Sequence, residues 1–180
     1  MPDYRRYRVP GGTYFFAINL SIKAPGCVLV RHIEPLREAV KCTRADRPFH
    51  IDAWVVLPDH IHCVITLPSG DDDFSNRIKA MKIRFVKALP PTEGRSSIRM
   101  AKGERGIWQR RFWEHAIRDE GDYARHMDYV HFSPLKHGYV SIGCALAPFD
   151  ISSVGEGRCL SMRLGWRGCA GYYAAGERRR

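Results

Sequence analysis

The segment AWVVLPDHIHCVITLP (residues 53–68) contains two apolar stretches separated by Pro58 and Asp59. Apolar and β-branched residues favour strands, and a proline followed by aspartate favours a bend. The segment therefore predicts two consecutive strands of one sheet. The second strand carries His60 and His62 within its apolar run. Burial of an unpaired polar group costs several kcal/mol, so both imidazoles need partners in the folded chain.

The flanking segments predict further strands and helices. Upstream, aromatic and β-branched residues at 13–20 predict a strand, and apolar residues at helical spacing predict a helix over 30–46. Downstream, the sequence predicts an amphipathic helix over 71–89, a polar loop over 90–106, and the last strand with its approach over 107–118. The order strand, helix, strand, strand, helix, strand is typical of an α+β, ferredoxin-like antiparallel sheet with helices on one face.

An additional C-terminal helix follows this core. We expect it over residues 119–133, ended by Pro134, because the residue before a proline is disfavoured in helical conformation. Tyr129 lies at the edge of an apolar stripe that is expected to dock on the sheet, so its phenol can reach the sheet face. A plain packing role fits the position equally. The stripe consists of Tyr123, Met127 and Val130.

Length and composition indicate a single-domain cytoplasmic protein. At 180 residues the chain suits one domain, which we place at 1–140, with a poorly defined tail over 141–180. No apolar run is long enough to cross a membrane, and the N-terminus lacks the apolar core of a signal peptide. Six cysteines at irregular spacing predict reduced, structural thiols.

The net charge of +10 is typical of a nucleic-acid-binding protein. Arginines alternate with aromatic residues in YRRYR (4–8) and WQRRFWEH (108–115), a combination that can stack bases and hold phosphates. The same pattern fits aromatic residues that pack inward beside solvated arginines. The candidate nucleic-acid contacts, in these two segments and on the basic faces of the helix at 71–89, are Arg5, Arg6, Arg8, Arg77, Lys82, Arg84, Arg110 and Arg111.

His60 and His62 point to the same face of their strand, because side chains alternate along a strand. Two adjacent imidazoles form half of a metal site. An isolated pair of this kind also occurs where one ring bonds a backbone carbonyl and the other is exposed. The motif alone leaves both interpretations open.

Four blocks of the sequence together resemble a known family. They are YRRYRVPGGTYFFAINL (4–20), RPFHIDAWVVLPDHIHCVITLP (47–68), DDDFSNRIKAMK (71–82) and GIWQRRFWEHAIRDEGDYARHMDYVHFSPLKHGYV (106–140). In order and spacing they resemble the REP-associated tyrosine transposases, single-domain relatives of the single-strand insertion-sequence transposases within the HUH endonucleases.

The resemblance implies a function on DNA in the bacterial cytoplasm, in association with the nucleoid. It implies that His60 and His62 hold a divalent cation, Mg²⁺ or Mn²⁺, and that Tyr129 is the nucleophile. It also implies a partner, a palindromic DNA hairpin with an adjacent single strand. The active form is expected to be a monomer or a homodimer.

One position departs from the family pattern. The family usually has an asparagine four residues after the tyrosine, where it completes the metal site, and this chain has Ser133. A water molecule could connect Ser133 to the metal, or Asp59, His126 or His131 could replace it. Alternatively, the nuclease activity is weakened. The sequence also matches poorly beyond residue 140.

Three functions remain open at this point. The first is a metal-dependent tyrosine endonuclease and strand transferase that proceeds through a 5′-phosphotyrosine intermediate. The second is a hairpin-binding protein with little cleavage. The third is a metal phosphoesterase in which His60 and His62 activate water and Tyr129 is only structural.

Overall fold

The computed structural model describes residues 6–21, 27–91 and 105–139. Arg5 and the expected tail at 141–180 lie outside the described residues. The elements, in chain order, are β1 (Thr13–Asn19), α1 (Val28–Arg31), α2 (Ile33–Asp46), β2 (His50–Val56), β3 (His60–Thr66), α3 (Phe74–Ala88), β4 (Trp113–Ala116) and α5 (Glu120–Lys136).

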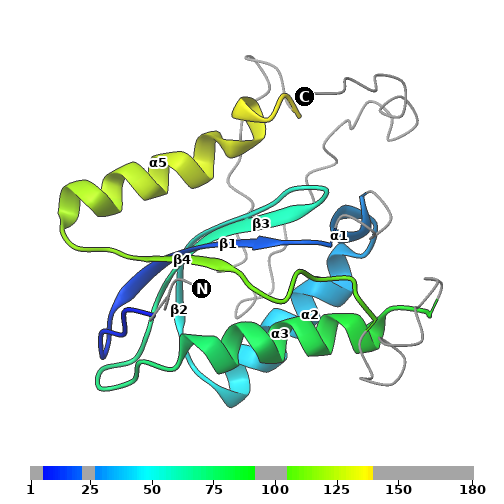
Figure 1. Cartoon of the computed structure of the whole chain (residues 1–180), viewed down its shortest axis with the longest axis horizontal. Coiled ribbons are helices and arrows are strands. Elements are labelled where there is room, and N and C mark those ends of the chain that lie inside the picture. The colour runs from blue at the N-terminus through cyan, green and yellow to red at the C-terminus, as the bar shows by residue number, and fades with distance from the viewer. Residues whose placement is uncertain (1–5, 22–26, 92–104, 140–180) are drawn as a thin grey trace, which may run out of the picture.

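The four strands form one antiparallel sheet in the order β2-β3-β1-β4. Helices α2 and α3 pack together on one face, and α5 lies on the opposite face (Figure 1). This arrangement confirms the predicted ferredoxin-like α+β fold with an extra C-terminal helix. In the described part of the chain, no helix combines the length and the apolar character that a membrane span requires.

Alternating side chains divide the sheet between two cores. From β1, Tyr14, Phe16 and Ile18 enter the larger core, which α2 and α3 cover. Phe15 faces the other way and forms a smaller core with Ala53, Val64 and Val130. Tyr123 and Met127 pack against this smaller core, which confirms the predicted apolar stripe of α5.

Two predicted helix boundaries were wrong, and proline is involved in both. The helix expected over 30–46 is divided at His32 into α1 and α2. Pro35 lacks an N–H and its ring clashes with the carbonyl four residues earlier, so a continuous helix is disfavoured there.

The helix expected to end before Pro134 instead continues to Lys136, with Pro134 inside it. Proline removes one helical hydrogen bond, but the pattern resumes immediately, because the His137 backbone N–H donates to Ser133 O at 3.0 Å. The extra turn changes which side chains reach the sheet.

Candidate metal and nucleophile site

The paired histidines of β3 face α5. His60 and His62 point to the same side as Val64, whereas Ile61 and Cys63 belong to the larger core on the other side. Both imidazoles are buried, with 8% and 6% of their surface exposed, and their ring centroids are 4.6 Å apart. The strand thus presents two adjacent nitrogen ligands beneath the C-terminal half of α5.

His60 is oriented by a carboxylate. Its Nδ1 lies 2.7 Å from Oδ1 of Asp59. A carboxylate at that nitrogen accepts the ring proton, which leaves the Nε2 lone pair available to a metal ion. Asp59 is therefore positioned to orient a ligand.

His62 is held neutral. Burial, together with the adjacent His60 and His137, lowers the pKa of His62 to about 4, although a backbone hydrogen bond with Phe16 and the charge of Asp59 act in the opposite direction. Its Nδ1 is buried and has no hydrogen-bond partner among the described residues. A neutral imidazole with an unpaired nitrogen is chemically suited to metal binding.

Tyr129 lies beside the histidine pair. Its ring centroid is 5.1 Å from that of His62 and 5.6 Å from that of Phe15. The side chain is half-buried, and the Nζ of Lys136 lies 4.8 Å from the centre of its ring. The phenol of Tyr129, the imidazoles of His60 and His62 and the ammonium of Lys136 thus lie together at one edge of the α5–sheet interface.

Ser133 is buried within the last turns of α5. Its side chain is fully inaccessible, and its hydroxyl donates to Tyr129 O at 2.6 Å. The hydroxyl is therefore bonded within its own helix. Three other residues were candidates to replace Ser133 as a metal ligand. Asp59 bonds His60, His126 belongs to a second cluster with His115 and Asp122, and the His131 side chain is exposed.

His137 was missed by the sequence analysis. It follows Ser133 by one helical turn and caps α5, where its ring centroid is 4.9 Å from that of His60. One ligand atom from each of His60, His62 and His137 lies within 4.8 Å of the others. The predicted helix end at Pro134 placed His137 outside the helix, and only the continued helix brings it to the sheet.

A second cluster lies at the start of α5. The carboxylate of Asp122 is 2.7 Å from Nε2 of His115 on β4 and 3.2 Å from Nδ1 of His126. Asp122 also accepts from the Arg118 backbone N–H at 3.1 Å. The His115 hydrogen bond is the largest influence that lowers the pKa of Asp122 to about 2. These bonds fasten the first turn of α5 to β4.

Comparison with known proteins supports one family. The chain is 42% identical over 178 residues to the REP-associated tyrosine transposase of Escherichia coli (strain K12), covering 99% of this chain and 98% of that protein. It is 43% identical over 143 residues to a putative REP-associated tyrosine transposase of Haemophilus influenzae (strain ATCC 51907 / DSM 11121 / KW20 / Rd), covering 79% of this chain and 81% of that protein. The chain belongs to the REP-associated tyrosine transposases. No family model matches it.

A solved structure of a REP-associated tyrosine transposase agrees with this assignment. It is bound to a REP hairpin, is 46% identical, and superposes with a TM-score of 0.65 over 78% of this chain and 76% of that chain. This transposase therefore shares both sequence and fold with a protein solved on hairpin DNA.

The predicted DNA contacts of this transposase occupy different environments. Arg77 is buried, and its guanidinium bonds the Asp71 carboxylate and the Pro48 carbonyl, so it is a structural residue. Arg110 and Arg111 are exposed just before β4. Four others make contacts within the chain: Arg6 with Ser75 and Glu114, Arg8 with Asp72, Lys82 with Gln109 O, and Arg84 with Asp46.

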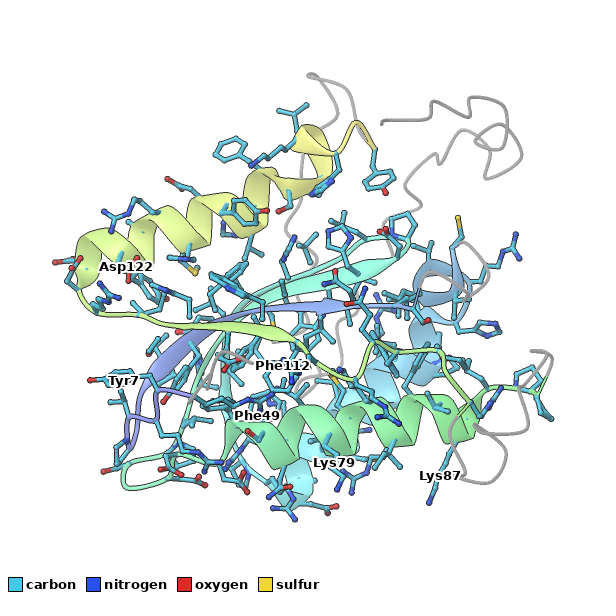
Figure 2. The ribbon with its side chains drawn as sticks, in the orientation of Figure 1. Tyr7, Phe49, Lys79, Lys87, Phe112 and Asp122 are labelled. Atoms are coloured by element: carbon cyan, nitrogen blue, oxygen red, sulfur yellow. The ribbon has the colours of Figure 1, made fainter. Side chains whose placement is uncertain are left out.

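Aromatic residues near these arginines also divide between interior and surface. Phe112 packs into the larger core on the α3 side of the sheet, with the Arg6 guanidinium 4.1 Å from its ring centroid (Figure 2). Trp113 faces the α5 side and is 52% exposed. Of these two neighbouring rings, that of Trp113 is the more open to solvent.

Proposed function

We propose that this transposase cuts and rejoins single-stranded DNA beside REP-type hairpins through a phosphotyrosine at Tyr129. The proposal is supported above all by the position of Tyr129, whose ring centroid is 5.1 Å from that of His62. Family membership supports the class of reaction, and the hairpin bound by the related structure supports the class of substrate.

The phenol oxygen of Tyr129 would attack the phosphorus of the target linkage. A bond forms between that oxygen and phosphorus, the P–O3′ bond breaks, and the phenol proton is released. The products are a 5′-phosphotyrosine and a free 3′-OH. Attack by another 3′-OH reverses these bond changes, so strand transfer needs no external energy source.

The residues around Tyr129 fit a divalent metal. His60 and His62 offer imidazole nitrogens, His62 has an unpaired buried nitrogen, and Asp59 orients His60. A divalent cation at this position would polarise a phosphoryl oxygen and orient the linkage. The ammonium of Lys136, beside the Tyr129 ring, is placed to pair with a phosphate oxygen.

A labelled hairpin with a single-stranded extension tests the proposal. Incubation with Mn²⁺ and separation on a denaturing gel should show a covalent protein–DNA adduct. Tyr129→Phe should abolish the adduct, and Tyr139→Phe, a matched change of a nearby phenol, should retain it.

The same gel separates the two alternatives. Hairpin binding without any cut would support a binding protein with little catalysis. Cleavage that survives Tyr129→Phe would indicate a phosphoesterase that uses water, and would overturn the assignment of Tyr129.

A further inference from the structure

Three imidazoles converge from two elements of the fold. His60 and His62 come from β3, and His137 comes from the end of α5. Ring centroids are 4.6 Å apart for His60 and His62, 4.9 Å for His60 and His137, and 6.3 Å for His62 and His137. The buried Nδ1 of His62 has no hydrogen-bond partner among the described residues.

The serine that replaces the family's asparagine does not complete this cluster. Ser133 has no exposed surface, and its hydroxyl donates to the Tyr129 carbonyl at 2.6 Å. With its proton donated to that carbonyl, the neutral Ser133 hydroxyl offers a cation only a weak oxygen ligand. His137 offers an imidazole nitrogen instead, and its ring is already beside His60 and is solvent-exposed.

We propose that His137 is the third protein ligand of the cation at His60 and His62, and that this all-imidazole set selects Zn²⁺, Co²⁺ or Mn²⁺ over Mg²⁺. The inference rests on the proposed function for the role of the ion, and its test measures metal binding directly.

The chemistry of the ligands determines the class of ion. Mg²⁺ prefers oxygen ligands in octahedral geometry, and three neutral nitrogens offer it little. Imidazole binds first-row transition ions more tightly than it binds Mg²⁺. Among these ions, Co²⁺ and Zn²⁺ generally bind more tightly than Mn²⁺. Three histidines with one open position also form the ligand set of known catalytic zinc sites. Because His137 is solvent-exposed, a cation held there would be open to a DNA phosphate.

The continued helix explains why this ligand is available. His137 reaches the sheet because α5 remains helical past Pro134. On β3, the Asp59 carboxylate bonds the ring of His60. His137 is therefore already positioned, and His60 already oriented, before an ion arrives.

Co²⁺ titration of the full chain without DNA tests the inference. The visible absorption of Co²⁺ should show one ion bound per chain at this cluster, displaced by Zn²⁺ and not by a large excess of Mg²⁺. His137→Ala should weaken Co²⁺ binding by more than the roughly 10- to 100-fold typical of losing an outer-shell partner. His131→Ala, a matched change on the exposed face of α5, should have no effect.

Two results would overturn the inference. One is Co²⁺ binding in His137→Ala equal to that of the unchanged chain, and the other is equal competition by Mg²⁺. The variant His115→Ala tests for binding at the second cluster. If His115→Ala loses the Co²⁺ absorption and His137→Ala keeps it, the ion binds at Asp122 instead.

Failure of this inference is distinguishable from failure of the proposed function. If the Tyr129 adduct forms but is indifferent to His137→Ala, the function stands and the ligand assignment is wrong. If Co²⁺ binding depends on His137 but no adduct forms, the metal site stands and the nuclease function is wrong.

Discussion

At the scale of single residues, Ser133 is the most informative position, because the resemblance to the family leads us to expect an asparagine there. From the sequence alone, an asparagine restored there could repair a weakened metal site. The structure gives a different expectation, because Ser133 is fully buried and bonded to Tyr129 O. A larger polar side chain has no open space at this position.

We therefore expect Ser133→Asn to destabilise the protein without improving metal binding. Overpacking of a buried position typically costs about 1–3 kcal/mol. Thermal unfolding should show a lower midpoint, and Co²⁺ affinity should not rise. Ser133→Ala, which keeps the volume small, should remain close to the unchanged chain. Tighter Mg²⁺ binding by Ser133→Asn would show that position 133 does face the cation.

Residue types and spacing predicted only part of this site. The common face of His60 and His62 follows from strand alternation, a purely local property. The contribution of His137 depends on whether the chain remains helical past Pro134, and local preference gives the wrong answer there. Arg77 resembled its solvated neighbours on α3, and its burial depends on Pro48, which is distant in sequence.

At the scale of elements, α5 determines where Tyr129, the proposed nucleophile, lies. Its first turn is capped by Asp119, whose Oδ1 accepts from the Asp122 backbone N–H at 2.8 Å. Asp122 in turn bonds His115 on β4. His126 stacks on His115 and contacts Phe15, and Phe15 contacts the Tyr129 ring. The attachment of α5 to β4 and the position of Tyr129 are thus linked by direct contacts.

This attachment should weaken in acid. The folded protein lowers the pKa of Asp122 from 3.8 to about 2, so folding favours the charged carboxylate. The stabilisation is present above about pH 4 and is lost as the pH falls toward 2, because the unfolded chain then binds the proton more readily. Protonation would remove the negative charge that pairs with His115, His126 and Arg125, which all face this carboxylate.

Urea unfolding between pH 7 and pH 2.5 measures this effect. Asp122→Asn should lose about 1–3 kcal/mol of stability at pH 7, the typical cost of breaking buried hydrogen bonds, and should show a smaller further loss in acid. Asp128→Asn, an exposed carboxylate on the same helix, is the control. An acid transition identical in Asp122→Asn and the unchanged chain would exclude Asp122 as its source.

At the scale of the whole molecule, the proposed chemistry and the basic residues of α3 and of the segment before β4 occupy different regions. The histidine cluster and Tyr129 lie between the sheet and α5, whereas Lys79 and Lys87 project from α3 on the opposite side (Figure 2). Arg110 and Arg111 precede β4, one of the two edge strands of the sheet. A DNA hairpin bound along this edge would place its single strand near Trp113 and the α5 side.

Binding and cleavage should therefore respond to different substitutions. Arg110→Ala combined with Arg111→Ala should weaken hairpin binding and reduce the slope of log affinity against log salt by about one for each DNA phosphate that these arginines neutralise. Arg31→Ala combined with Lys41→Ala removes the same charge from exposed positions on α1 and α2, and should leave that slope nearly unchanged.

His60→Ala should abolish adduct formation while largely preserving hairpin affinity, because phosphate contacts and not the cation dominate binding. Equal losses of affinity and cleavage in His60→Ala would contradict this division between the cluster and the β4 edge.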